Sequence, residues 1–194
     1  MNKAVWFMCV TNPRCGAMLT SSAIKECVRS GKIKIDPFNE NQLNPNSYNV
    51  RINGIIRELV PLSGHIDSRN PNFQSGCIFS IPESGLIIYP GNIYLIQTVE
   101  EIGSEIYVPI LTGRSSSGRL GISVHQAADF GDLGYFGKFT LQVSVVYPTK
   151  IYPNQQLAQI YFLCSESHDI AQDILYHGHY ANQGSPVIHP DALK

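Results

Sequence analysis

The chain has 194 residues, of which 43% are hydrophobic and 15% are charged, and its net charge is −1 with a pI of about 6.6. This length fits one domain with short appendages, and the apolar content is sufficient for a core. The near-neutral charge argues against a broad nucleic-acid-binding surface, which would be strongly basic, but permits a small anion held by a few arginines. The low charged content favours a surface partly covered by partner subunits.

The N-terminal segment 1-MNKAVWFMCVTNPRCGA-17 contains one lysine and a short apolar run from Ala4 to Val10. That run lies at the lower limit for a signal-peptide core, and no clean cleavage site follows it. We therefore expect residues 1–17 to be an extension, either disordered or arising from the choice of start site. No apolar run approaches the length of a membrane span, so no membrane partner is expected.

The cysteine content excludes two kinds of site and favours one compartment. The number of cysteines is odd, and no Cys-x-x-Cys pair occurs. They are Cys9, Cys15, Cys27, Cys77 and Cys164. A disulfide framework or a zinc ribbon is therefore not expected, and free thiols favour a reducing, cytoplasmic compartment.

The stretch 21-SSAIKECVRSG-31 predicts a short helix. Ser21 or Ser22 can cap its N-terminus, and Gly31 stands where a C-terminal cap belongs. An apolar stripe marks its buried face, formed by Ile24, Cys27 and Val28.

Strand-like runs fill most of the remaining chain, separated by Gly, Pro and Asn, with no internal repeat. These runs span residues 48–52, 77–81, 86–89, 93–99, 106–111, 138–147 and 157–163. Many short strands at this spacing predict an all-β sandwich or barrel. The polar, glycine-rich segment 176-YHGHYANQGSP-186 predicts a loop or flexible tail.

The run 113-GRSSSGR-119 is the first candidate for chemistry. Its three hydroxyls, backbone N–H groups and two arginines predict a cradle for an anion such as phosphate. It is not a P-loop, because Arg119 and Leu120 follow the second glycine where Lys and Ser/Thr are needed. A P-loop also opens a helix, whereas residues 119–124 predict a strand. An ordinary polar turn is the alternative interpretation.

Three acid–base groups follow this run: His125, Asp129 and Asp132. An Asp beside glycines is often only a turn residue. A zinc deaminase would carry His-x-Glu and a later Pro-Cys-x-x-Cys, and both are missing from the sequence. A serine hydrolase is not expected either, because no G-x-S-x-G elbow occurs.

These residues carry a resemblance to a known family. The stretch from Gly113 to Gln142 resembles the core of the dCTP deaminase and dUTPase superfamily, closest to the branch of deaminases and bifunctional dCTP deaminase/dUTPases. Further segments resemble the family's opening helix with its L-x-P-x-S-Y-[DN]-[LV]-R strand, its P-G-x-x-x-L-x-x-T-x-E segment, its R-I-A-Q-L strand and its closing tail. They are residues 18–52, 89–102, 154–162 and 179–186, so the resemblance covers residues 18 to about 188.

The resemblance implies an architecture. It is a distorted β jelly roll or barrel of the dUTPase-like type with a short N-terminal helix, assembled as a homotrimer with active sites between subunits. The β domain would span residues 18–175. Residues 176–194 would form a tail that closes over the nucleotide site.

The resemblance also implies roles for individual residues. Arg114, Ser115 and Ser116 would hold the triphosphate, with Mg²⁺ bound through the phosphates rather than by protein ligands. Arg119 would lie beside the reacting centre, and Asp132 would hold the sugar hydroxyl or a water. The further nucleotide contacts that it implies are Ala128 at the base, Tyr135 on the deoxyribose, Gln159, Tyr176, His179 and Gln183. Tyr135 could equally be a core aromatic residue, and Gln159 a polar residue facing the barrel.

The chain departs from the family pattern at two positions. The deaminases carry a Glu ten residues after the Asp, as the acid–base group of zinc-free deamination, and Gln142 stands there in this chain. An amide has no useful pKa and cannot shuttle that proton, although it can hydrogen-bond a pyrimidine edge. His179 replaces the usual tail Lys, and a mostly neutral imidazole is a weaker phosphate ligand.

The favoured hypothesis is therefore Mg²⁺-dependent hydrolysis of dUTP to dUMP and pyrophosphate, with Asp132 activating the water. The second hypothesis is a dCTP deaminase in which His125, Asp129 or a bound water replaces the missing Glu, although the sequence spacing argues against each. A diphosphatase for dCTP or a modified pyrimidine, and a catalytically silent nucleotide-binding regulator, complete the alternatives. Binding of nucleic acid is not expected.

Overall fold

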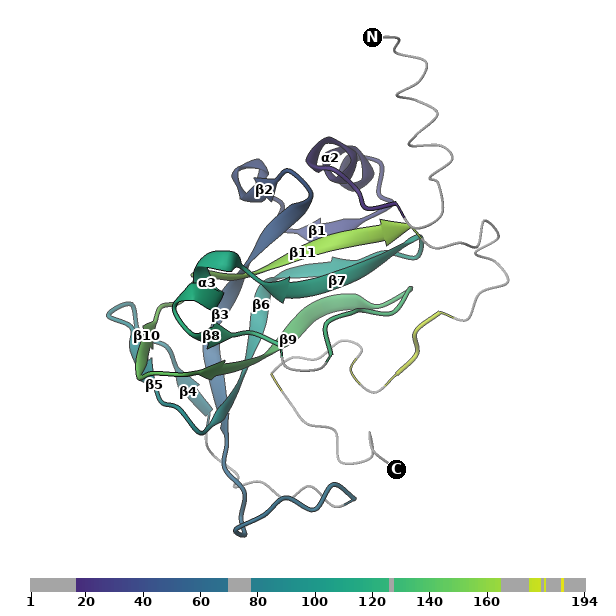
Figure 1. Cartoon of the computed structure of the whole chain (residues 1–194). Coiled ribbons are helices and arrows are strands. Elements are labelled where there is room, and N and C mark those ends of the chain that lie inside the picture. The colour runs from purple at the N-terminus through teal and green to yellow at the C-terminus, as the bar shows by residue number, and fades with distance from the viewer. Residues whose placement is uncertain are drawn as a thin grey trace.

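A computed structural model describes residues 17–69, 78–125, 128–164, 175–178, 180 and 186. Within these residues the chain is mostly β, and its main sheet curves into a nearly closed barrel accompanied by two short α-helices (Figure 1). The expected all-β, barrel-like class is thus confirmed. The expectations for residues 1–16, His179 and Gln183 lie outside the described residues.

The elements follow one another along the chain in short segments. The helices are α2 (Ser21–Arg29), the 3₁₀ turn η1 (Glu40–Gln42) and α3 (Ser115–Arg119). The strands are β1 (Lys34–Asp36), β2 (Leu43–Asn44), β3 (Ser47–Leu59), β4 (Ile78–Ser80), β5 (Leu86–Ile88), β6 (Ile93–Gly103), β7 (Tyr107–Gly113), β8 (Ile122–Ser123), β9 (Phe136–Val145), β10 (Thr149–Ile151) and β11 (Gln156–Cys164).

The main sheet has nine strands, with the path β7-β11-β3-β6-β9-β8, and β5 pairs with β10 in a separate sheet. On β9 every second side chain is buried, namely Leu141, Val143 and Val145, because successive side chains of a strand point to opposite faces. The same alternation on the other strands builds one core that includes Tyr48 and Phe162.

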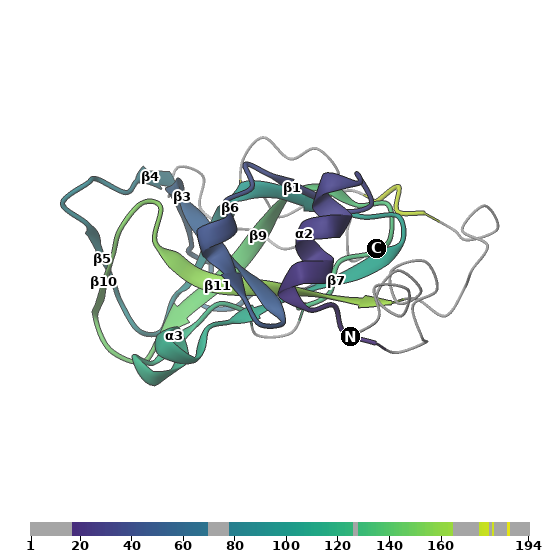
Figure 2. The same ribbon diagram turned by 90° about the horizontal axis from the view of Figure 1, so that it is seen from above.

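Helix α2 packs on the sheet over β3 and beside β11 (Figure 2). Thr20 occupies its N-cap position without a side-chain capping bond to the backbone, so the expected cap at Ser21 or Ser22 is wrong. The backbone N–H of Ser21, the first helical residue, donates to the Pro45 carbonyl at 2.8 Å, so one of the free N–H groups at the helix start has a backbone partner. Gly31, with φ of +75°, ends the helix as expected.

Strand β6 leaves its regular ladder around Thr98 and Glu100, where its register with β9 shifts. The hydroxyl of Thr98 accepts the backbone N–H of Phe139 at 3.0 Å and donates to the Glu100 carbonyl at 2.7 Å. On the other side, the Glu100 carboxylate accepts the backbone N–H of Arg51 at 2.9 Å. Side chains therefore replace the backbone acceptors that the irregularity removes, and no N–H of this set is left without a partner.

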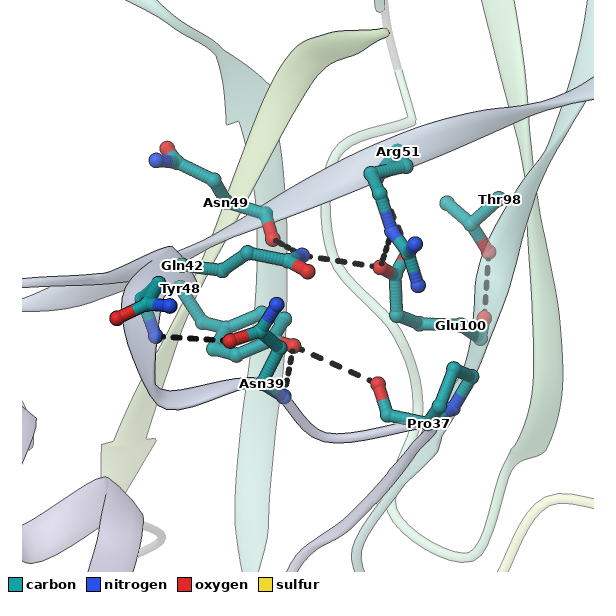
Figure 3. Close-up of polar contacts among 9 residues, drawn as sticks. Pro37, Asn39, Gln42, Tyr48, Asn49, Arg51, Thr98 and Glu100 are labelled. Atoms are coloured by element: carbon teal, nitrogen blue, oxygen red, sulfur yellow. Dashed lines mark hydrogen bonds and ion pairs between the residues drawn. The ribbon is translucent and has the colours of Figure 1, made fainter. Parts of the chain in front are cut away.

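Glu100 is fully buried and is balanced by Arg51 (Figure 3). The Arg51 Nε donates to the carboxylate at 2.7 Å, and Gln42 Nε2 donates to it at 3.0 Å. Gln42 Nε2 also donates to the Asn49 carbonyl at 2.7 Å. A buried carboxylate needs both a counter-charge and hydrogen bonds, and Glu100 has both. This network joins η1, β3 and β6.

Candidate active site

The serine-rich run forms the short helix α3, which strand β11 holds in place. Arg114 Nη1 donates to the Gln156 carbonyl at 2.8 Å, and Ser117 Oγ donates to the Leu157 carbonyl at 2.8 Å. α3 lies beside β8 at one end of the barrel (Figure 1). The run is therefore a helical turn anchored by its neighbours, rather than an irregular loop.

The exposed side chains of α3 are Ser115, Ser116 and Arg119. Ser117 is buried, and its hydroxyl is already used in the bond to β11, so two hydroxyls rather than three face solvent. Arg114 uses one guanidinium N–H for its backbone contact, and a guanidinium has five N–H donors. The exposed surface of α3 thus combines hydroxyl and guanidinium donors, which is the chemistry that binds phosphate.

Gln159 connects Gly113, which comes just before the N-cap residue of α3, to β3. Its Nε2 donates to the Gly113 carbonyl at 3.1 Å, and its Oε1 accepts the Ser47 hydroxyl at 2.9 Å. Both ends of the amide therefore have protein partners, which suits a residue that positions the start of α3. A direct contact between Gln159 and a nucleotide stays a prediction.

Asp132 lies in the loop that leads into β9. The backbone N–H of Gly131 donates to the Pro109 carbonyl of β7 at 2.7 Å. The Asp132 carbonyl accepts the N–H of Tyr135 at 3.2 Å, which closes a turn around Gly134 with φ of +82°. The Asp132 side chain is exposed. The turn therefore presents the carboxylate to solvent on a backbone fixed against β7.

Tyr135 is buried next to this turn, with 9% of its surface exposed. Its hydroxyl donates to the Lys138 carbonyl at 2.6 Å, and its ring packs edge-on against Phe139 and Tyr176, with centroids 5.0 and 5.6 Å away. Burial raises the pKa of Tyr135 to about 12. The structure thus brings Tyr135, Tyr176 and the Asp132 turn together, and the contact of Tyr135 with deoxyribose stays a prediction.

Gln142 lies on β9, on the face opposite the main core. Its neighbours Leu141 and Val143 point into the core, whereas Gln142 is only partly buried. Its backbone N–H donates to the Val124 carbonyl at 3.1 Å. His125 is the next residue along the chain and follows the end of β8 by two residues.

The surroundings of His125 favour its neutral form over its charged form. Burial lowers its pKa, and the charge of Asp129 opposes that effect more weakly. Both ring nitrogens are buried and have no hydrogen-bond partner. The sequence spacing argued against His125 as a replacement for the missing Glu, and the bond from Gln142 to the Val124 carbonyl brings the backbone next to His125 close to Gln142.

The α3 residues and Asp132 lie at different points along β7. Arg114 directly follows the last residue of β7, whereas Gly131 bonds to Pro109 and the chain then runs toward the beginning of that strand. At about 3.3 Å per residue, Asp132 and Arg114 are roughly 20 Å apart. One chain therefore does not unite the expected phosphate ligands with the expected water-activating carboxylate.

Among the described residues there is neither a cluster of metal-binding side chains nor a membrane-spanning helix. In that part of the chain no group of three or more His, Cys, Asp or Glu side chains could hold a metal ion. None of the helices there is long and apolar enough to cross a bilayer. Ala128 is exposed. Binding of Mg²⁺ through a triphosphate, and a role for Ala128 at the base, stay predictions.

The sequence patterns missed Ser47 and Ser117, which fix α3 to the barrel. Ser47 belongs to the quoted S-Y-N segment and Ser117 to the serine run, so both were visible as residues. Their function as anchors depends on which strand lies next to them, and strand order cannot be predicted from a local sequence pattern.

Comparison with known proteins identifies the family. The family model for dCTP deaminase-like proteins matches residues 18–164. The dUMP-forming dCTP deaminase of Clostridium beijerinckii is 42% identical over 152 residues, which cover 77% of this chain and 83% of the relative. The enzyme of the same description from Clostridium acetobutylicum is 38% identical over 177 residues, covering 91% and 96%.

Among solved structures, the dCTP deaminase of Agrobacterium tumefaciens aligns with a TM-score of 0.61 at 20% identity, over 78% of this chain and 49% of that one. At that identity the match shows the fold alone. The family model and the relatives show more than the fold, namely the family, because they span most of the chain. The chain belongs to the dCTP deaminase-like family.

Proposed function

We propose that this protein hydrolyses dUTP to dUMP and pyrophosphate and has lost the deamination of dCTP. Its relatives are named dUMP-forming dCTP deaminases. Forming dUMP from dCTP requires two reactions, the loss of the amino group and the loss of pyrophosphate. The observation that carries the proposal is Gln142, an amide where the deaminase branch has a carboxylate.

Gln142 removes the group that deamination needs. Water must lose a proton to attack the base, and the leaving amino group must gain one, so a group that both accepts and donates protons has to contact the base. A carboxylate does both, whereas an amide does neither at neutral pH. Its hydrogen-bonding ability is retained, so Gln142 can still hold a pyrimidine.

The hydrolytic reaction needs residues that this chain keeps. Asp132 is exposed on a rigid turn, as required of a group that orients or deprotonates a water for in-line attack at the α-phosphate. The exposed Ser115, Ser116 and Arg119 supply donors for the phosphates. When bound, Mg²⁺ would neutralise charge on the triphosphate, and the phosphate oxygens together with water would be its ligands.

The separation of Asp132 from Arg114 within one chain supports a composite site. A second copy of the chain, placed so that its α3 meets the Asp132 turn, would complete the machinery. This arrangement suits the homotrimer with interfacial active sites that the family resemblance implies. The described chain also exposes large apolar residues at its surface, as expected of a subunit; they include Ile78, Phe79, Tyr89 and Tyr147.

A second candidate function is deamination of dCTP with His125 as the proton-transfer group. The observation that favours it is that His125 follows Val124, whose carbonyl accepts the Gln142 N–H, and that both ring nitrogens of His125 are unpartnered. A neutral imidazole can accept a proton from water and return it to a leaving group. This candidate predicts ammonia from dCTP, and it predicts that His125→Ala abolishes that product.

The test scores both products in one assay. Purified protein with Mg²⁺ is given dUTP and dCTP in separate reactions, and ammonia and pyrophosphate are measured in each. Pyrophosphate from dUTP without ammonia from dCTP is the expected result, and Asp132→Asn should remove it. Ammonia from dCTP would contradict the proposal. Pyrophosphate from dCTP alone would show that the substrate is dCTP rather than dUTP. Nucleotide binding without either product would indicate a catalytically silent regulator.

Gln142→Glu is the matched variant for the deaminase half. It restores the carboxylate of the deaminase branch with no change in side-chain length. If ammonia appears only in this variant, the native protein lacks deamination because of this single group. If the native protein already releases ammonia at the rate of the variant, the interpretation of Gln142 is wrong.

A further inference from the structure

Three buried side-chain nitrogen atoms have no hydrogen-bond partner in the part of the chain that the structure describes. They are Nε of Arg57 and both ring nitrogens of His125. Buried polar atoms without partners are rare, since each one costs the free energy of removing it from water. Two such residues in one region therefore need a physical explanation.

One of the two residues, Arg57, lies on the same face of the sheet as Gln142 and in line with it. Arg57 on β3 pairs with Leu95 on β6, and Leu95 pairs with Gln142 on β9. Directly paired residues of antiparallel strands have their side chains on the same face. Because Gln142 points away from the main core, Arg57 and Leu95 do so too.

His125 lies in the segment that follows β8, on the other side of Gln142 from Leu95. β8 pairs with β9 through Ser123 and Ser144, and the Gln142 backbone then bonds to the Val124 carbonyl. The side chain of Val124 is buried in the core, and both ring nitrogens of His125, one residue later, are buried without a partner. We call Arg57, Leu95, Gln142 and His125 the Gln142 row.

A purely structural role does not account for these residues. An apolar side chain in place of a buried, unpartnered imidazole would avoid the cost of dehydration. Retained polar groups without partners are typical of sites where a ligand supplies the missing hydrogen bonds. The neutral imidazole offers one donor and one acceptor, the Arg57 Nε–H offers a donor, and the Gln142 amide offers both.

We infer that His125 and Arg57 contact the bound nucleotide on either side of Gln142, and that His125 hydrogen-bonds the polar edge of the pyrimidine base. A pyrimidine edge alternates carbonyl acceptors with a ring or exocyclic N–H, which complements an amide next to a neutral imidazole. Arg57 lies two strands from Gln142, roughly 10 Å, and its long side chain contacts the same nucleotide from the opposite side. This inference rests on the proposed function only in requiring that the chain binds a pyrimidine deoxynucleotide.

The test uses apolar variants, His125→Leu and Arg57→Met, each with a matched control at an exposed residue of the same type. The controls are His65→Leu and Arg69→Met. Binding of the non-hydrolysable α,β-imido analogue of dUTP with Mg²⁺ is measured by calorimetry on the full chain. The melting temperature and the molar mass of the free protein are measured in parallel.

Each apolar variant should weaken the Kd for the analogue by about tenfold, the cost of one lost hydrogen bond to a buried group. The melting temperature should stay unchanged or rise, because an unpartnered polar group has been removed. For His125→Leu, affinity for deoxyribose triphosphate without a base should be unchanged, since the lost contact is to the base. The controls should bind as the native protein does.

Two results would overturn the inference. One is an unchanged Kd in both apolar variants. The other is a lower melting temperature or a smaller molar mass with affinity retained, which would assign the row to folding or subunit contact. Failure of the proposed function is separable, because native protein that binds the analogue but releases no pyrophosphate from dUTP would refute only the hydrolysis. Native protein that binds neither nucleotide would refute both.

Discussion

Replacing Glu100 with Gln should lower the free energy of unfolding by about 3 kcal/mol. Glu100 is fully buried and accepts three hydrogen bonds, two from Arg51 and one from Gln42. In the amide, one oxygen becomes an N–H₂ group that faces donors, so the backbone N–H of Arg51 loses its acceptor, at about 1–3 kcal/mol. The partly buried Arg51 charge, with 24% of its side chain exposed, also loses its counter-ion, and breaking a fully buried pair would cost about 3–5 kcal/mol.

The adjacent Glu101 provides the matched control. Its ion pair with Lys34 has an N···O distance of 2.6 Å, but both side chains are more than 40% exposed. The hydrogen bond and the charge of Lys34 lower the pKa of Glu101, yet exposed pairs of this kind contribute only about 0–1 kcal/mol. Urea unfolding at one fixed protein concentration measures both variants. Equal losses for Glu100→Gln and Glu101→Gln would refute the account of the network in Figure 3.

Three further predictions concern the site. Gln159→Leu removes the bonds to Gly113 and Ser47, so steady-state kinetics should show KM for the nucleotide rising about tenfold, and a change in kcat alone would contradict a positioning role. The pKa of His125 is lowered from 6.5, so as pH falls the unfolded state takes up a proton before the folded state does. The free energy of unfolding should therefore keep its full value above about pH 6.5 and decline below it. His125→Leu should flatten that part of a plot of the urea midpoint against pH. The phenol of Tyr135, with its pKa of about 12, should be missing from an ultraviolet titration to pH 11, and Tyr135→Phe should leave that titration unchanged.

Much of the fold was predictable because its elements follow local periodic patterns. The apolar stripe of α2 and the alternating residues of β9 each fix an element and its buried face. The short strands β1, β2 and β10 were not predictable, since two or three residues contain no period. β1 and β2 pair with the longer strands β6 and β3, whereas β10 pairs with the equally short β5.

The site was predictable in its residue types but not in its geometry. Asp132 and the serine run were predicted as functional residues. The replacement of the deaminase Glu by Gln142 could be recognised from its spacing after Asp132. That Ser117 turns inward, or that the backbone next to His125 bonds to Gln142, depends on contacts between residues 18 to 40 positions apart. Such contacts follow from strand register, and register is set by the whole sheet.

The distance between Asp132 and Arg114 along β7 has a genetic consequence. In the proposed homotrimer, each centre takes its carboxylate from one chain and its guanidinium from a neighbour. Two dead proteins, Asp132→Asn and Arg114→Ala, would then rescue each other when co-expressed. Random mixing in equal amounts makes about three quarters of the trimers mixed, each with one intact centre, so about a quarter of native activity returns. Loss of function at such a locus is allele-specific, because two different lesions can complement where two identical ones cannot.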